Sequence, residues 1–141
     1  MSKFVDVYPE TQELFDQVLE STLIPNWVEI KLMANNSQKE LYTIRKVNEL
    51  FEVLTNGLSI VLILNEEIFD KLEEEQQKLV FEEALTGVHV SDTDKISIEK
   101  YDFSTYSGML QKHGDETMIK LKESIISLFD EKRQEEAKQK E

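Results

Sequence analysis

The 141-residue chain contains no cysteine. A disulfide framework, a thiolate metal site and a cysteine nucleophile are therefore excluded, and a reducing compartment is favoured. Long apolar runs are also missing, because the longest, 58–64, is far too short to cross a bilayer. The first ten residues lack the charged and apolar blocks of a signal peptide. We therefore expect a cytoplasmic protein without membrane contact.

Glycine and basic residues are scarce. With only four glycines, the chain has no glycine-rich phosphate loop. Its 16 lysines and arginines stand against 29 acids, which gives a net charge of -13. Because phosphate binding needs clustered cations, we expect no direct binding of nucleic acid. The acidic surface is either a solvated exterior or a surface that attracts basic partners or imitates DNA.

The remaining polar motifs are weak. Neither His89 nor His113 has a neighbouring serine in a glycine-flanked turn, which argues against a serine hydrolase. The sequence SDTD, 91–94, begins like a calcium loop but lacks the glycine and glutamate that such a loop needs later. We expect an ordinary turn with an Asx hydrogen bond, in which an aspartate side chain accepts from the backbone, and no cofactor.

Hydrophobic periodicity predicts a single α+β domain over residues 1–132, with a short mixed sheet, several helices and a long C-terminal helix. Residues 133–141 are predicted to be a charged, frayed tail. The run 58–64 is continuous and β-branched, so we expect a central strand covered on both faces. Helices are predicted at 9–21, 46–57, 79–87, 103–114 and 115–132, and a short helix or turn at 66–77. Strands are predicted at 26–34, 41–47, 58–65 and within 91–102.

The stretch LVFEEALTGVH, 79–89, places two adjacent acids in an apolar helical stripe. Glu83 follows Leu79 by four residues and Val80 by three, so its side chain should point toward the core. A buried carboxylate must be hydrogen-bonded or protonated, because an unpaired buried charge is costly. The metal helix of a zinc peptidase carries a glutamate general base between two histidines four residues apart. Here Glu82 and Thr86 stand where those histidines belong.

The order of segments over residues 9–114 resembles the small zincin-like metallopeptidases of bacteriophages and prophages. The sequence YDFSTYSGMLQKHG keeps the shape of that family's His-Asp-x-x-x-Phe segment, which leads into a helix ending in glycine. The resemblance implies a zincin-like domain that has lost its metal ligands, with Tyr101 in place of the third histidine and Asp102 at the aspartate. Thr86 and Tyr101 are then the expected hydrogen-bonding partners of Glu83.

This reading predicts no metal and no catalytic residue, and leaves Glu83 at a vestigial base position. The vestigial site comprises Glu82, Glu83, Thr86, Tyr101 and Asp102. One alternative is a divergent metal-dependent peptidase that uses Glu83 as general base with non-standard ligands. His89 and the oxygens of this site would suit a harder ion than zinc. Another alternative is a plain virion or scaffold component.

Acidic residues are concentrated around the same helix, with 12 acids against four bases between residues 66 and 102. Retention of the fold without the metal-ligating histidines favours a role in binding over a role in catalysis. We expect a phage effector of the bacterial cytoplasm that engages a basic surface of a host protein, as an inhibitor or DNA mimic. The predicted binding residues are Glu66, Glu67, Asp70, Glu73, Glu74 and Glu75.

Overall fold

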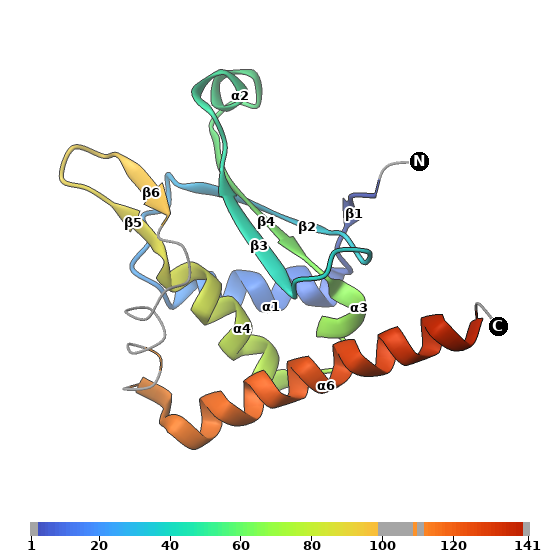
Figure 1. Cartoon of the computed structure of the whole chain (residues 1–141). Helices are drawn as coiled ribbons and strands as arrows, with labels where there is room; N and C mark the ends of the chain where they lie inside the picture. Colours follow the sequence, from blue (N-terminus) through green and yellow to red (C-terminus); the bar gives the residue numbers. More distant parts are fainter. Residues whose placement is uncertain (1–2, 99–108, 110–111, 140–141) are drawn as a thin grey trace.

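The computed structural model describes residues 3–98, 109 and 112–139, which form an α+β fold as predicted (Figure 1). Within these residues, no helix is long and apolar enough to cross a membrane. The elements are β1 (Val5–Asp6), α1 (Pro9–Glu20), β2 (Glu29–Ala34), β3 (Tyr42–Lys46), α2 (Glu49–Leu54), β4 (Leu58–Leu64), α3 (Glu66–Phe69), α4 (Glu74–Thr86), β5 (Val88–Val90), β6 (Ile96–Ile98) and α6 (Asp115–Gln139).

The main sheet is mixed and has the strand order β1-β2-β4-β3. β2 and β4 run parallel, while β1 and β3 are antiparallel to their neighbours. β4 is an inner strand, and Ile60, Leu62 and Leu64 on it are fully buried. The predicted inner strand is therefore confirmed, and β3 forms one edge of the sheet. The prediction that both faces are covered was wrong, because Val61 and Ile63 on the other face are only partly buried.

β5 and β6 form a separate antiparallel hairpin. Its turn contains SDTD, where the Lys95 amide donates a hydrogen bond to Ser91 Oγ at 3.0 Å and Asp94 has a left-handed φ of 59°. The predicted turn is confirmed, but the side chain that accepts the hydrogen bond is Ser91 and not the predicted aspartate. β5 itself was not predicted, because three residues directly after Gly87 give too little alternation to recognise.

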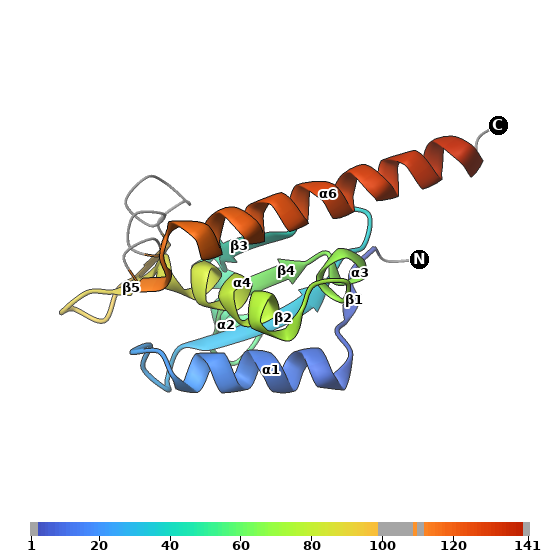
Figure 2. The ribbon, with the colours of Figure 1, turned by 90° about the horizontal axis from the view of Figure 1, so that it is seen from below.

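The helices α1, α4 and α6 lie on one side of the main sheet (Figures 1 and 2). An aromatic cluster joins three helices beneath it, because Phe81 of α4 packs edge-on against Phe15 of α1 and tilted against Phe69 of α3. The ring centroids are 5.2 Å and 4.8 Å apart, respectively. All three rings are buried, so this cluster is the centre of the core.

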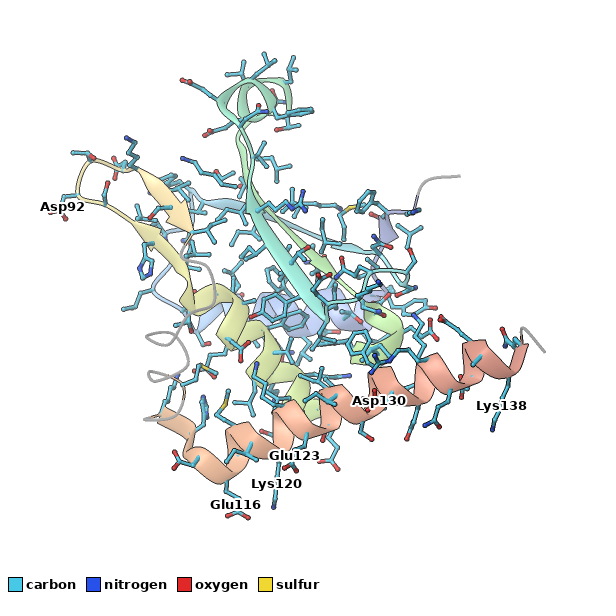
Figure 3. All side chains as sticks on the ribbon, in the orientation of Figure 1. Asp92, Glu116, Lys120, Glu123, Asp130 and Lys138 are labelled. Atoms are coloured by element: carbon cyan, nitrogen blue, oxygen red, sulfur yellow. The ribbon has the colours of Figure 1, made fainter. Side chains whose placement is uncertain are left out.

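The helix α6 follows its predicted apolar stripe. Met118 and Leu121 are fully buried, and Ile125, Leu128 and Phe129 pack partly buried against the core. Figure 3 shows charged side chains on the opposite side of this helix, pointing away from the rest of the molecule. α6 continues through 133–139, where every side chain is exposed, so this part of the predicted tail is helical.

α2 stands apart from the body, at the far end of β3 and β4 (Figure 1). It was predicted from its apolar stripe and from a left-handed cap at Asn56 and Gly57, which have φ angles of 59° and 105°. An apolar stripe normally faces a core. Here it faces solvent, with Leu50, Phe51, Val53 and Leu54 between 55% and 72% exposed.

We expect Phe81→Ala to lower the free energy of unfolding by about 3–5 kcal/mol, because it leaves a cavity between two other rings. Leu23→Ala is the control, since Leu23 is fully exposed and should change stability by less than about 0.5 kcal/mol. Urea unfolding followed by circular dichroism measures both. Equal stability of the two variants would contradict the assigned core.

Candidate functional site

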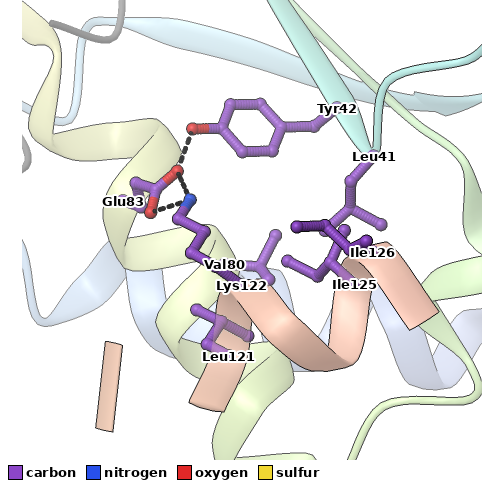
Figure 4. A pocket seen from close by; sticks show the side chains of 8 residues that line it. All are labelled: Leu41, Tyr42, Val80, Glu83, Leu121, Lys122, Ile125 and Ile126. Carbon is purple, nitrogen blue, oxygen red and sulfur yellow. Dashed lines mark hydrogen bonds and ion pairs between the residues drawn. The ribbon is translucent and has the colours of Figure 1, made fainter. Parts of the chain in front are cut away.

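Glu83 is buried, with 4% of its surface exposed, as its position in the apolar stripe predicted. Its carboxylate joins three elements (Figure 4). The Tyr42 hydroxyl of β3 donates a hydrogen bond to Glu83 Oε1 at 2.8 Å. Lys122 Nζ of α6 donates to Oε1 at 2.9 Å and to Oε2 at 2.8 Å. Both oxygens of the buried carboxylate are therefore satisfied, and its charge is paired.

One of the two predicted partners of Glu83, Thr86, does not contact its carboxylate. The Thr86 hydroxyl is exposed and donates instead to the Glu82 carbonyl oxygen at 2.6 Å, one helical turn back. This local bond is usual for a threonine inside a helix. The prediction of Thr86 as a partner was therefore wrong. Tyr101 and Asp102 lie outside the residues that the structure describes.

Glu82 points in a different direction from Glu83, as expected for adjacent residues about 100° apart on a helix. Its carboxylate forms an ion pair with Lys112, and its Oε2 lies 2.8 Å from His113 Nε2. His113 was not recognised as a neighbour, because 31 residues separate it from Glu82 and no spacing rule links the two.

The two carboxylates open onto different hollows of the surface. Glu83 and Lys122 lie at a cavity of about 310 Å³, which is otherwise mainly lined by aliphatic side chains such as Val80 and Ile125 (Figure 4). Glu82 instead lines a cleft of about 680 Å³ that also includes Thr86 and His89. Among the vestigial residues that the structure describes, Glu83 thus lies apart from Glu82 and Thr86.

This division bears on metal binding. Within residues 3–98, 109 and 112–139, no three histidine, aspartate or glutamate side chains come together as metal ligands. Glu82 and Glu83 belong to separate ion pairs, so they do not fit a shared ion. A carboxylate that already pairs with an ammonium group must lose that partner before it can bind a cation.

One predicted binding residue is not at the surface. Glu66 is buried, with 3% exposed, and its Oε2 accepts a hydrogen bond from the Tyr8 amide at 2.9 Å. Its assignment to an exposed acidic surface was therefore wrong. The sequence does not show this, because the amide that Glu66 accepts from lies 58 residues earlier.

The other five acids, which we call the acidic surface, are exposed: Glu67, Asp70, Glu73, Glu74 and Glu75. Three of them have cationic partners. Glu67 lies 3.5 Å from Lys132 Nζ, and both Glu74 and Glu75 lie 3.8 Å from Lys78 Nζ. Exposed pairs of this kind contribute little to stability.

Asp70 and Glu73 form no ion pair with a cation in the described part of the chain. Partial burial raises the pKa of the Asp70 carboxyl, and the negative charges of Glu66 and Glu10 raise it further. The junction between α3 and α4 therefore carries two carboxylates without a cationic partner in the described part of the chain, one of which, Glu73, is the N-cap residue of α4.

No protein-family model, curated protein or solved structure matches the chain.

We expect Lys122→Met to lower the free energy of unfolding by up to about 3–5 kcal/mol, because it leaves the buried Glu83 carboxylate without a cation. Glu83→Leu added to Lys122→Met should recover most of this loss, since no unpaired buried charge then remains. Lys120→Met is the matched control, because the partner of Lys120 among the described residues is exposed Glu116 on the same helix. If Lys122→Met were no more destabilising than Lys120→Met in urea unfolding, the pair would not support the fold.

We expect Asp70→Asn to raise the midpoint of thermal unfolding at pH 7 by about 1–2 °C. The raised pKa means that the folded protein holds the Asp70 proton more tightly than the unfolded chain does. Ionised Asp70 therefore destabilises the fold at neutral pH, and this loss disappears as the pH falls through the folded-state pKa. The gain should vanish at pH 3. Asp92→Asn, in the exposed β5–β6 turn, is the control, and a gain that persisted at pH 3 would contradict this account.

Proposed function

We propose that this chain is a catalytically inactive, zincin-like protein of a phage or prophage that binds a basic surface of a host protein in the bacterial cytoplasm. The proposal rests mainly on the state of Glu83. In the frame of a metallopeptidase helix, Glu83 is the residue that would act as general base, and here it is held in an internal ion pair.

A general base must accept a proton from water bound at the metal, so its oxygen has to face that water. The Glu83 oxygens instead accept hydrogen bonds from Lys122 and Tyr42, and the side chain is almost completely buried. The same bonds give Glu83 a structural role, since they connect α4 to β3 and α6. A structural role of this kind accounts for the presence of Glu83 without any catalytic activity, which supports the proposal of an inactive protein.

The acidic surface supports a role in binding. Partial burial raises the pKa of the Asp70 carboxyl, and the negative charges of Glu66 and Glu10 raise it further, so a lysine or arginine of a partner would relieve this part of the repulsion. Glu73 adds a second charge that has no ion pair in the described part of the chain. Opposite charge on a partner would also accelerate its association with the acidic surface.

The binding proposal is tested by capturing host proteins from bacterial lysate on the immobilised full chain. We expect a basic protein to bind at low salt and to dissociate at high salt, because salt screens exposed charges. Asp70→Asn combined with Glu73→Gln should lower its affinity about threefold or more. The matched control is Glu116→Gln with Glu123→Gln, which removes the same charge from the outward side of α6 (Figure 3). Equal losses in both variants would indicate non-specific attraction and contradict the proposal.

The absence of catalysis is tested separately. Protein purified without chelator should hold no tightly bound metal ion, and zinc should not raise its midpoint of thermal unfolding. One bound ion per chain, together with peptide hydrolysis that Glu83→Gln abolishes, would contradict the proposal and favour a divergent metallopeptidase.

A further inference from the structure

The strongest unexplained feature of the described chain is the apolar side of α2. Of the six residues of this helix, Leu50, Phe51, Val53 and Leu54 are more than half exposed. On a helical projection they span one continuous side, and Glu49 and Glu52 occupy the other. Single exposed apolar residues are common, but a contiguous apolar patch on a protruding element marks an interaction site.

Hydrogen bonds at both ends of α2 hold the helix that carries this patch. The Asn48 side chain caps α2 by accepting a hydrogen bond from the Phe51 amide at 2.9 Å. At the other end, the Gly57 amide donates to the Glu52 carbonyl at 2.8 Å. The Val47 amide donates to the Ser59 carbonyl at 2.8 Å and joins the incoming and outgoing chain. The helix is therefore a fixed platform for its apolar side chains.

We use the name α2 arm for residues 45–58, which include α2 and the chain on either side of it. The α2 arm has two bases, Arg45 and Lys46, and two acids, Glu49 and Glu52, so its net charge is zero. The whole chain has a net charge of -13, so the excess of acids lies elsewhere. A basic partner is thus attracted to other parts of the surface, whereas the α2 arm offers neutral, apolar contact.

We infer that the α2 arm is a self-association surface, through which two copies of the chain pair α2 against α2 about a two-fold axis. A two-fold interface brings the same patch of both copies together, so an apolar patch finds a complementary surface in its own copy. The balanced charge allows close approach, and the acids on α2 of one copy can meet Arg45 or Lys46 of the other.

A cleft beside the α2 arm extends this surface. Its volume is about 470 Å³, and its lining includes the half-exposed ring of Trp27 together with Val47 and Ile96. Lys46 and Glu49 also line it, one of each sign. Glu52, Asp94 and Lys95 line it as well, so the cleft gives the second copy three apolar side chains beside charges of both signs. The inference is independent of the proposed function, because it involves none of the acidic surface and not Glu83.

Sedimentation equilibrium of the full chain over a wide range of concentrations tests the inference. We expect a reversible dimer. Leu50→Gln combined with Leu54→Gln should weaken it at least about tenfold, because it removes two apolar side chains from the interface without changing the charge. The matched control is Leu23→Gln with Ile119→Gln, which removes two exposed apolar side chains away from the arm and should leave the dimer unchanged.

A charge exchange gives a second, independent test. Lys46→Glu alone and Glu49→Lys alone should each weaken the dimer, and the double variant should restore it, since it again balances the charge. A wild-type chain that stays monomeric at every concentration would overturn the inference and indicate a different occupant for the patch. Equal dissociation of the arm and control variants would overturn it as well. Circular dichroism verifies that each variant is folded. If Leu50→Gln with Leu54→Gln does not fold, the charge exchange alone decides whether the dimer forms through the α2 arm.

Discussion

The arrangement of this fold depends on one buried ion pair. Glu83 on α4 has to be paired, since a lone carboxylate in the core would cost several kcal/mol. Tyr42 and Lys122 satisfy it from β3 and α6. A hydrophobic contact tolerates sliding, but a carboxylate with both oxygens bonded does not. The pair therefore specifies how the edge of the sheet, the central helix and the last helix lie relative to one another.

The sequence predicted features whose cause is local. The inner strand 58–64, the left-handed positions at Asn56 and Gly57, and the inward direction of Glu83 follow from periodicity, turn chemistry and helical spacing. The partners of Glu83 could not be predicted, because they come from elements far away in the chain. The burial of Glu66 was missed for the same reason. The orientation of α2 was missed because an apolar stripe looks identical whether it faces its own core or another molecule.

Two regions of the surface would attract other molecules by different forces, one electrostatic and one hydrophobic. Uncompensated charge at the junction of α3 and α4 acts over about a Debye length and weakens with salt. The apolar side of α2 acts only on contact and is nearly indifferent to salt. Because the α2 arm is neutral and projects away from the helices that carry the acids, the two surfaces need not compete for one partner (Figure 1).

The spacing of the ion pair along the chain has a consequence for protein synthesis. Tyr42 precedes Glu83 by 41 residues, and Lys122 follows it by 39. The sheet and α4 therefore leave the ribosome before the ammonium group that neutralises the buried carboxylate does. Until α6 emerges, Glu83 has to remain in water, which keeps that side of α4 open. The last helix is thus the element whose arrival closes the core.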